Sequence, residues 1–138
     1  MRIFFSVPGD PKTQQRHRSF RMGTKMSTYD PSAKEKKDFL VLAFNEKPEK
    51  PMEGPISMTI KLYYSRPKNH YGSGKNASNL KPTSPHFHTS RPDADNAFKF
   101  VSDSLNSVFY KDDSQICMLQ VIKLYSETPR TEILIENL

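Results

Sequence analysis

Cysteine is almost absent from this chain of 138 residues, which contains only Cys117. A single thiol excludes an internal disulfide framework and any zinc site built from several cysteines. No apolar run approaches the roughly 20 residues that a membrane-spanning helix needs, and the apolar stretch near the N-terminus is too short for a signal peptide. We therefore expect a soluble intracellular protein without a membrane partner, folded as one domain over residues 1–138.

Several catalytic signatures are also missing. The run from Gly72 to Asn76 is superficially similar to a phosphate-binding loop, but it lacks the first glycine at the required spacing and a Ser or Thr after the lysine. His86 and His88 could present two imidazoles on one side, yet no Cys or His set with zinc-site spacing accompanies them. No Ser-His-Asp arrangement can be argued, and nothing indicates a small-molecule cofactor.

Acidic residues are scarce in the first two thirds of the chain. Lysine and arginine number 21 against 15 aspartates and glutamates, which gives a net charge of +6. Residues 1–92 carry 17 basic and 7 acidic side chains, a net of +10, whereas residues 93–138 carry 4 and 8, a net of −4. A basic body attracts a polyanion such as DNA by counterion release. Ordinary solubilising charge is the alternative.

The apolar pattern predicts an α+β domain with the order β-α-β-loop-α-β-β, in which the helices pack on one mixed sheet. Residues 8–21, rich in turn formers and cations, are expected to be a loop. Residues 115–125 are apolar on both faces and are expected to form a central strand, with Cys117 as an inert buried thiol and residues 128–130 as the following hairpin turn. The other predicted elements are strands at 2–7, 56–64 and 131–136 and helices at 31–45 and 94–107.

Residues 65–92 lack periodic apolar residues and are rich in Gly, Ser, Asn, Pro, Lys and His. Loops longer than about 12–15 residues in a compact domain are usually functional or disordered, so we expect a mobile loop over about 66–91. Phe20, in the basic N-terminal cluster, could stack on unpaired bases or simply anchor a loop. The cations expected to contact DNA are Lys12, Arg16, Arg18, Arg21, Lys75 and Arg91.

Carboxylates gather where the helix of residues 94–107 should begin. Pro92 biases the residue before it toward extended backbone, which would make Asp93 the N-cap and put Asp95 in the first turn, where the helix dipole favours negative charge. Lys99 and Asp103 follow Asp95 at steps of four residues, so the three should share one polar face.

A second carboxylate pair, Asp112 and Asp113, lies between this helix and the next strand. If it converges with Asp93 and Asp95, a divalent cation would be needed to neutralise the cluster. Mg²⁺ prefers carboxylate and phosphate oxygens and can support phosphodiester cleavage, to which Lys99 would add a fixed positive charge. The alternative is that these residues are only a helix cap, a surface ion pair and a turn.

The run RPDADNAFKFVSDSLNSVFYKDDSQI resembles the core motif of the RusA family of Holliday junction resolvases: Asp-x-Asp-Asn, a lysine shortly after it, a helix and then Asp-Asp-x-Gln. Residues 9–11 with the cations after them, and residues 28–31, are similar to the family's N-terminal segment, so the resemblance covers most of the chain. Two features depart from it: the loop 65–92 is longer than the shortest relatives need, and Arg91 replaces a common lysine. The resemblance implies essential, metal-binding carboxylates at Asp93, Asp95 and Asp113 and an essential lysine at Lys99.

This resemblance implies a function in DNA recombination and repair. The protein would be a crossover junction endodeoxyribonuclease that hydrolyses phosphodiester bonds with Mg²⁺ and resolves four-way DNA junctions as a homodimer. It would work in the cytoplasm of a bacterium, or of the host if a phage or prophage encodes it. Two alternatives stay open: a catalytically silent DNA-binding phage accessory protein, and a nuclease that cuts flaps or other branched DNA with the same site.

Overall fold

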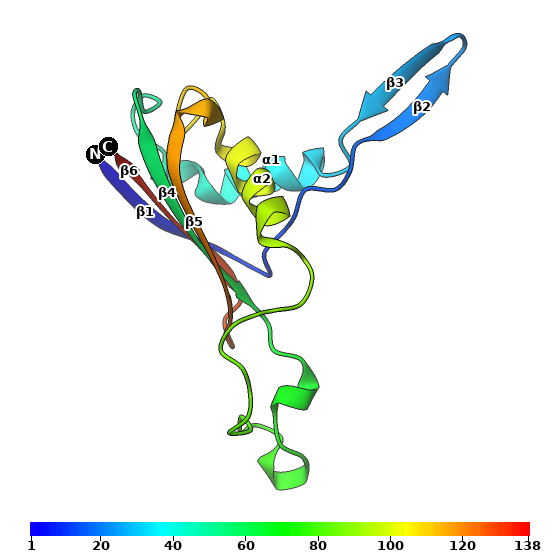
Figure 1. Cartoon of the computed structure of the whole chain (residues 1–138), viewed down its shortest axis with the longest axis vertical. Coiled ribbons are helices and arrows are strands. Elements are labelled where there is room, and N and C mark those ends of the chain that lie inside the picture. The colour runs from blue at the N-terminus through cyan, green and yellow to red at the C-terminus, as the bar shows by residue number, and fades with distance from the viewer.

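A four-stranded mixed sheet forms the centre of the computed structural model, which describes residues 1–138 (Figure 1). The strands lie in the order β1-β6-β4-β5. β6 is antiparallel to both β1 and β4, whereas β4 and β5 are parallel. The bounds of the strands are β1 (Arg2–Pro8), β4 (Ile56–Tyr64), β5 (Ile116–Tyr125) and β6 (Arg130–Asn137).

Two helices, α1 (Ala33–Ala43) and α2 (Ala94–Leu105), cover one face of this sheet (Figure 1). The strand predicted at residues 56–64 is confirmed as β4, and alternate residues along it, Ile56, Met58, Ile60, Leu62 and Tyr64, are all buried. Full burial of such a side chain contributes about 1.5–3 kcal/mol, so this face of β4 is a large part of the core. The predicted α+β class and the packing of helices on a mixed sheet are confirmed. No helix is both long enough and apolar enough to cross a membrane.

Two segments project from this body (Figure 1). The first is the hairpin, residues 18–29, in which β2 (Arg18–Met22) pairs with β3 (Lys25–Tyr29) in an antiparallel sheet of two strands. The second is the arm, residues 65–92, with the short 3-10 helices η2 (Lys68–His70) and η3 (Gly74–Asn76). The expectation of a simple loop through residue 21 was wrong, because β2 lies there. The mobility expected for residues 66–91 stays a prediction.

β5 lies at an edge of the sheet, so the expectation of a central strand was wrong. A strand that is apolar on both faces is ordinarily enclosed, but here Cys117, Met118 and Leu119 remain exposed. The expected inert buried thiol at Cys117 is therefore also wrong. Residues 128–130 do not join neighbouring strands as a hairpin turn, because β6 pairs with β1 and β4 and lies on the far side of β4 from β5.

Candidate functional site

The start of α2 presents Asp93, Asp95 and Lys99. Asp93 is the N-cap residue, as predicted, with extended backbone (φ −74°, ψ 150°), but its side chain makes no capping hydrogen bond. Asp95 lies in the first turn and Lys99 one turn later, and all three side chains are exposed. None of them takes part in an ion pair. Both carboxylates are therefore accessible to a cation.

Two hydrogen bonds fix the chain around the start of α2. The backbone N–H of Gln14, in the segment that leads into the hairpin, donates to the carbonyl of Asn96 at 3.1 Å. The Lys123 ammonium, near the end of β5, donates to the carbonyl of Ser90 at 2.7 Å. The hairpin and the arm thus both leave the body close to Asp93.

Asp103 shares the exposed face of α2 with Asp95 and Lys99, but it has a partner of its own. The Lys36 ammonium of α1 lies 3.1 Å from the Asp103 carboxylate and 2.6 Å from that of Asp30. Burial favours a higher pKa for Asp30, but hydrogen bonds from Lys36, the Ser32 amide and Gln14 outweigh it and lower the pKa to about 2. Asp103 is thus part of a link between the two helices.

The Asp-Asp-x-Gln motif forms a capped turn, η4 (Asp113–Gln115). The Asp112 carboxylate accepts hydrogen bonds from the hydroxyl and the amide of Ser114, and these lower its pKa. The Gln115 side chain accepts from the Asp112 amide at 2.8 Å and donates to the carbonyls of Met52 and Gly54, each at 2.9 Å. Asp112 and Gln115 are therefore occupied in building the turn, and the Asp113 carboxylate has no hydrogen bond.

Asp113 does not join Asp93 and Asp95 within one chain. α2 lies between them, and its 12 residues extend over about 18 Å at 1.5 Å per residue; η4 is beyond the far end of the helix (Figure 1). Burial raises the pKa of Tyr110, and the charges of Asp113, Asp103 and Asp112 raise it further, so Asp113 is near the C-terminal half of α2. No group of three His, Cys, Asp or Glu side chains in the chain is arranged to hold a metal ion. The donor types suit Mg²⁺, but a single chain does not assemble them.

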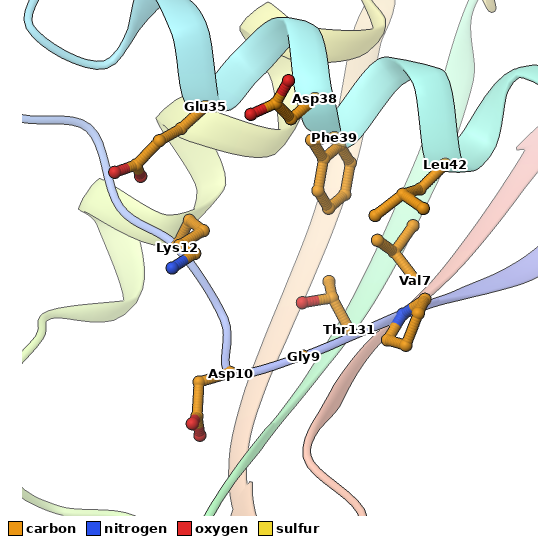
Figure 2. A pocket seen from close by; sticks show the side chains of 10 residues that line it. Val7, Gly9, Asp10, Lys12, Glu35, Asp38, Phe39, Leu42 and Thr131 are labelled. Carbon is orange, nitrogen blue, oxygen red and sulfur yellow. The ribbon is translucent and has the colours of Figure 1, made fainter.

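The cations predicted to contact DNA have two kinds of setting. Lys12 lines a pocket between α1 and the end of β1, together with three carboxylates, Asp10, Glu35 and Asp38 (Figure 2). These negative charges make that pocket unfavourable for a phosphate. The others are exposed on the hairpin, on the arm or beside them, without an ion-pair partner; they are Arg16, Arg18, Arg21, Lys75 and Arg91.

An aromatic cluster at the base of the arm could not be foreseen from the sequence. The His88 ring stacks on Tyr64 with ring centroids 4.0 Å apart, and its centroid is 5.0 Å from that of Tyr125. Burial, aided by the Lys123 charge, lowers the pKa of His88, so its imidazole is neutral at pH 7. Burial raises the pKa of Tyr64 to about 12. These residues are far apart in the sequence and follow no periodic pattern, so only tertiary structure brings them together.

Comparison with known proteins supports the resemblance to the RusA family. The family model described as Endodeoxyribonuclease RusA matches residues 8–136. The Bacillus subtilis (strain 168) protein YqaN is 39% identical over 142 residues, which cover 98% of this chain and 96% of that protein. A Lactococcus phage r1t protein named crossover junction endodeoxyribonuclease rusA is 27% identical over 133 residues, with 94% and 92% covered. The chain therefore belongs to the RusA endodeoxyribonuclease family.

Proposed function

We propose that the protein resolves four-way DNA junctions by Mg²⁺-dependent hydrolysis of phosphodiester bonds, in DNA recombination and repair. The observation that carries this proposal is the start of α2, where Asp93, Asp95 and Lys99 are exposed together and unpaired in a chain of an endodeoxyribonuclease family. Two free carboxylates and a free ammonium suit a site that receives a metal ion and a phosphate together. Because its substrate would be chromosomal or phage DNA, we infer that it acts in the bacterial cytoplasm.

The proposed metal ligands are Asp93, Asp95 and Asp113. When bound there, Mg²⁺ would supply an activated water and neutralise charge on the phosphate. Lys99, one turn along α2 from Asp95, would hold a positive charge beside the same phosphate throughout the reaction. Because Asp113 lies toward the opposite end of α2 from Asp93 and Asp95, these three carboxylates can meet at one metal ion only if Asp113 comes from another chain.

We infer that a second copy of the chain supplies Asp113. Along β5, the backbone groups of Lys123 and Tyr125 that face away from β4 bond to residues 88 and 86. Because successive residues of a strand point their backbone groups to opposite sides, those of Leu119 and Val121 also face outward, where no strand pairs with them. An unpaired edge of this kind is a template for a strand from another chain.

Antiparallel pairing of two β5 edges around Leu119 would complete both sites. Asp113 precedes the start of β5, while Ser90, three residues before Asp93, is bonded to Lys123 near its end. A twofold axis through the middle of β5 therefore brings the start of one strand to the end of the other. Each Asp113 would then lie near the partner's α2, and a closed twofold dimer, the commonest oligomer, would carry two sites for the two opposed cuts that a junction requires.

The proposal is tested with purified protein and end-labelled DNA in three forms: linear duplex, flap and four-way junction, each with and without Mg²⁺. We expect cleavage of the four-way junction into paired nicked duplexes only when Mg²⁺ is present. Cleavage confined to flaps would replace the resolvase assignment with a flap nuclease using the same carboxylates. Tight junction binding with no cleavage in Mg²⁺ would instead identify a catalytically silent DNA-binding protein.

A further inference from the structure

Two long segments of the chain contain no acidic residue, residues 11–29 and residues 54–92. The first includes the hairpin and the second includes the arm. None of their lysines or arginines forms an ion pair with a carboxylate. Those on the arm are Arg66, Lys68, Lys75, Lys81 and Arg91.

The arm and the hairpin point in different directions from the body (Figure 1). The segment that leads into the hairpin and the end of the arm both lie near the start of α2, as the bonds of Gln14 to Asn96 and of Lys123 to Ser90 show. The proposed carboxylates therefore stand where two cationic projections diverge. A single straight duplex cannot follow two diverging projections, whereas branched DNA offers one duplex to each.

The base of the arm is fixed to the sheet. His88 is held between Tyr64 and Tyr125, and residues 86–88 add backbone bonds along the free edge of β5 at Lys123 and Tyr125. The Arg66 guanidinium lies 5.3 Å from the Tyr125 ring and donates to the carbonyl of Pro85 at 2.8 Å. Arg66 is thus occupied at the base, and the arm leaves the body in a defined direction.

The outer part of the arm has no apolar support of its own. No residue from 65 to 90 is buried, and Lys68, Lys75 and Lys81 are all exposed. Backbone bonds within the arm, such as Gly72 N–H to the carbonyl of Asn79 at 2.9 Å and Lys81 N–H to that of His70 at 2.9 Å, keep it folded back on itself. The arm therefore offers unpaired positive charge on a folded backbone.

We propose that the arm is a duplex-binding element that contacts the phosphates of one branch of the DNA, while the hairpin contacts another. This inference rests on the proposed function and assigns the arm a share in recognising branched substrates. Contact is with the sugar–phosphate backbone and is independent of sequence, because ammonium groups on phosphates carry no base information. A second copy of the chain is a poor occupant, since two acid-free arms would repel each other.

The test compares two triple variants in binding to a fluorescent four-way junction over a series of salt concentrations, in EDTA so that nothing is cut. One variant is Lys68→Ala, Lys75→Ala and Lys81→Ala; the matched control is Lys34→Ala, Lys37→Ala and Lys50→Ala, three exposed lysines of the α1 side. Losing three phosphate contacts should make the slope of log affinity against log salt shallower by about 2.7. A fourfold rise in salt concentration should then lower the junction affinity of the wild-type protein about 40-fold more than that of the variant with the three arm lysines replaced. The control should keep the wild-type slope.

A second measurement uses the wild-type chain alone and so does not depend on the folding of any variant. Shortening all four branches of the junction to one helical turn should remove DNA from the reach of the arm and lower the salt slope toward that of the arm variant. An unchanged slope in either experiment would overturn the proposal, as would an arm variant whose only change is its oligomeric mass. Binding is measured here without cleavage. A protein that fails to cut junctions would therefore refute the proposed function, whereas an unchanged salt slope would refute only the role of the arm.

Discussion

Asp112 and Asp113 are neighbours in the sequence, but their side chains have different surroundings. The Asp112 carboxylate is bonded to Ser114 and closes a capping box with Gln115, which itself is bonded to Met52 and Gly54. This arrangement fixes the turn that carries Asp113 and leaves the Asp113 carboxylate without a hydrogen bond. The pattern Asp-Asp-x-Gln identified the motif, yet only the hydrogen bonds distinguish the carboxylate that builds the turn from the one that remains available.

This difference predicts unequal effects for two substitutions that remove the same charge from adjacent positions. Asp113→Asn should abolish Mg²⁺-dependent junction cleavage and leave binding in EDTA at least as tight, because one repulsive charge facing DNA is lost. Asp112→Asn should keep most of the cleavage, because asparagine is also a good N-cap acceptor. Cleavage of the labelled junction under single-turnover conditions measures both. An active Asp113→Asn protein, or a dead but folded Asp112→Asn protein, would reverse the assignment.

At the scale of elements, the sequence predicted those with one buried face. β4 has the expected bounds, and α2 begins at the expected residue and ends at Leu105, two residues early. β2 and β3 escaped prediction because neither buries a face, so no period of two was imposed on their side chains. The edge position of β5 could not be predicted from the sequence either. The order of strands in a sheet depends on pairing between distant segments, and the apolar pattern of one strand does not reveal its neighbours.

The free edge of β5 predicts that one proline controls dimerisation. The Leu119 amide should face away from β4, so Leu119→Pro should leave the β4–β5 ladder intact while removing a donor from the proposed interface; proline is tolerated on edge strands for this reason. We expect the light-scattering mass to fall from about twice the 15.9 kDa of the chain to that of a monomer, together with loss of cleavage.

Leu119→Ala is the control for that experiment, since it removes the same side chain but keeps the N–H. It should remain dimeric at the concentrations used for cleavage. A dimeric and active Leu119→Pro protein would show that the two chains meet elsewhere. A monomer that still cuts junctions, with a rate proportional to protein concentration, would remove the need for a partner altogether.

Across the molecule as a whole, the regions of highest positive charge adjoin the proposed site. The excess of +10 noted for residues 1–92 is concentrated in projections that leave the body beside the start of α2. The sequence predicted a basic body and candidate metal-binding carboxylates within it, and the family match supports the resemblance from which those carboxylates were inferred. The sequence could not predict that Asp95 and Asp113 are far apart, because the motif spacing does not show that they lie toward opposite ends of α2 in the folded chain.

That separation predicts that two inactive variants regain activity when they are mixed. If each site takes Asp95 from one chain and Asp113 from its partner, a mixed dimer of Asp95→Asn and Asp113→Asn chains has one site with both lesions and one with neither. The two variants are mixed in equal amounts, with time for subunits to exchange. Half of the dimers should then be mixed, and each mixed dimer has one intact site of two. Nicking should therefore return with roughly a quarter of the wild-type number of active sites. Product analysis on a junction labelled on all strands should reveal single nicks in place of paired cuts. If both carboxylates act within the same chain, every site in every dimer contains a lesion, and the mixture will stay as inactive as its components.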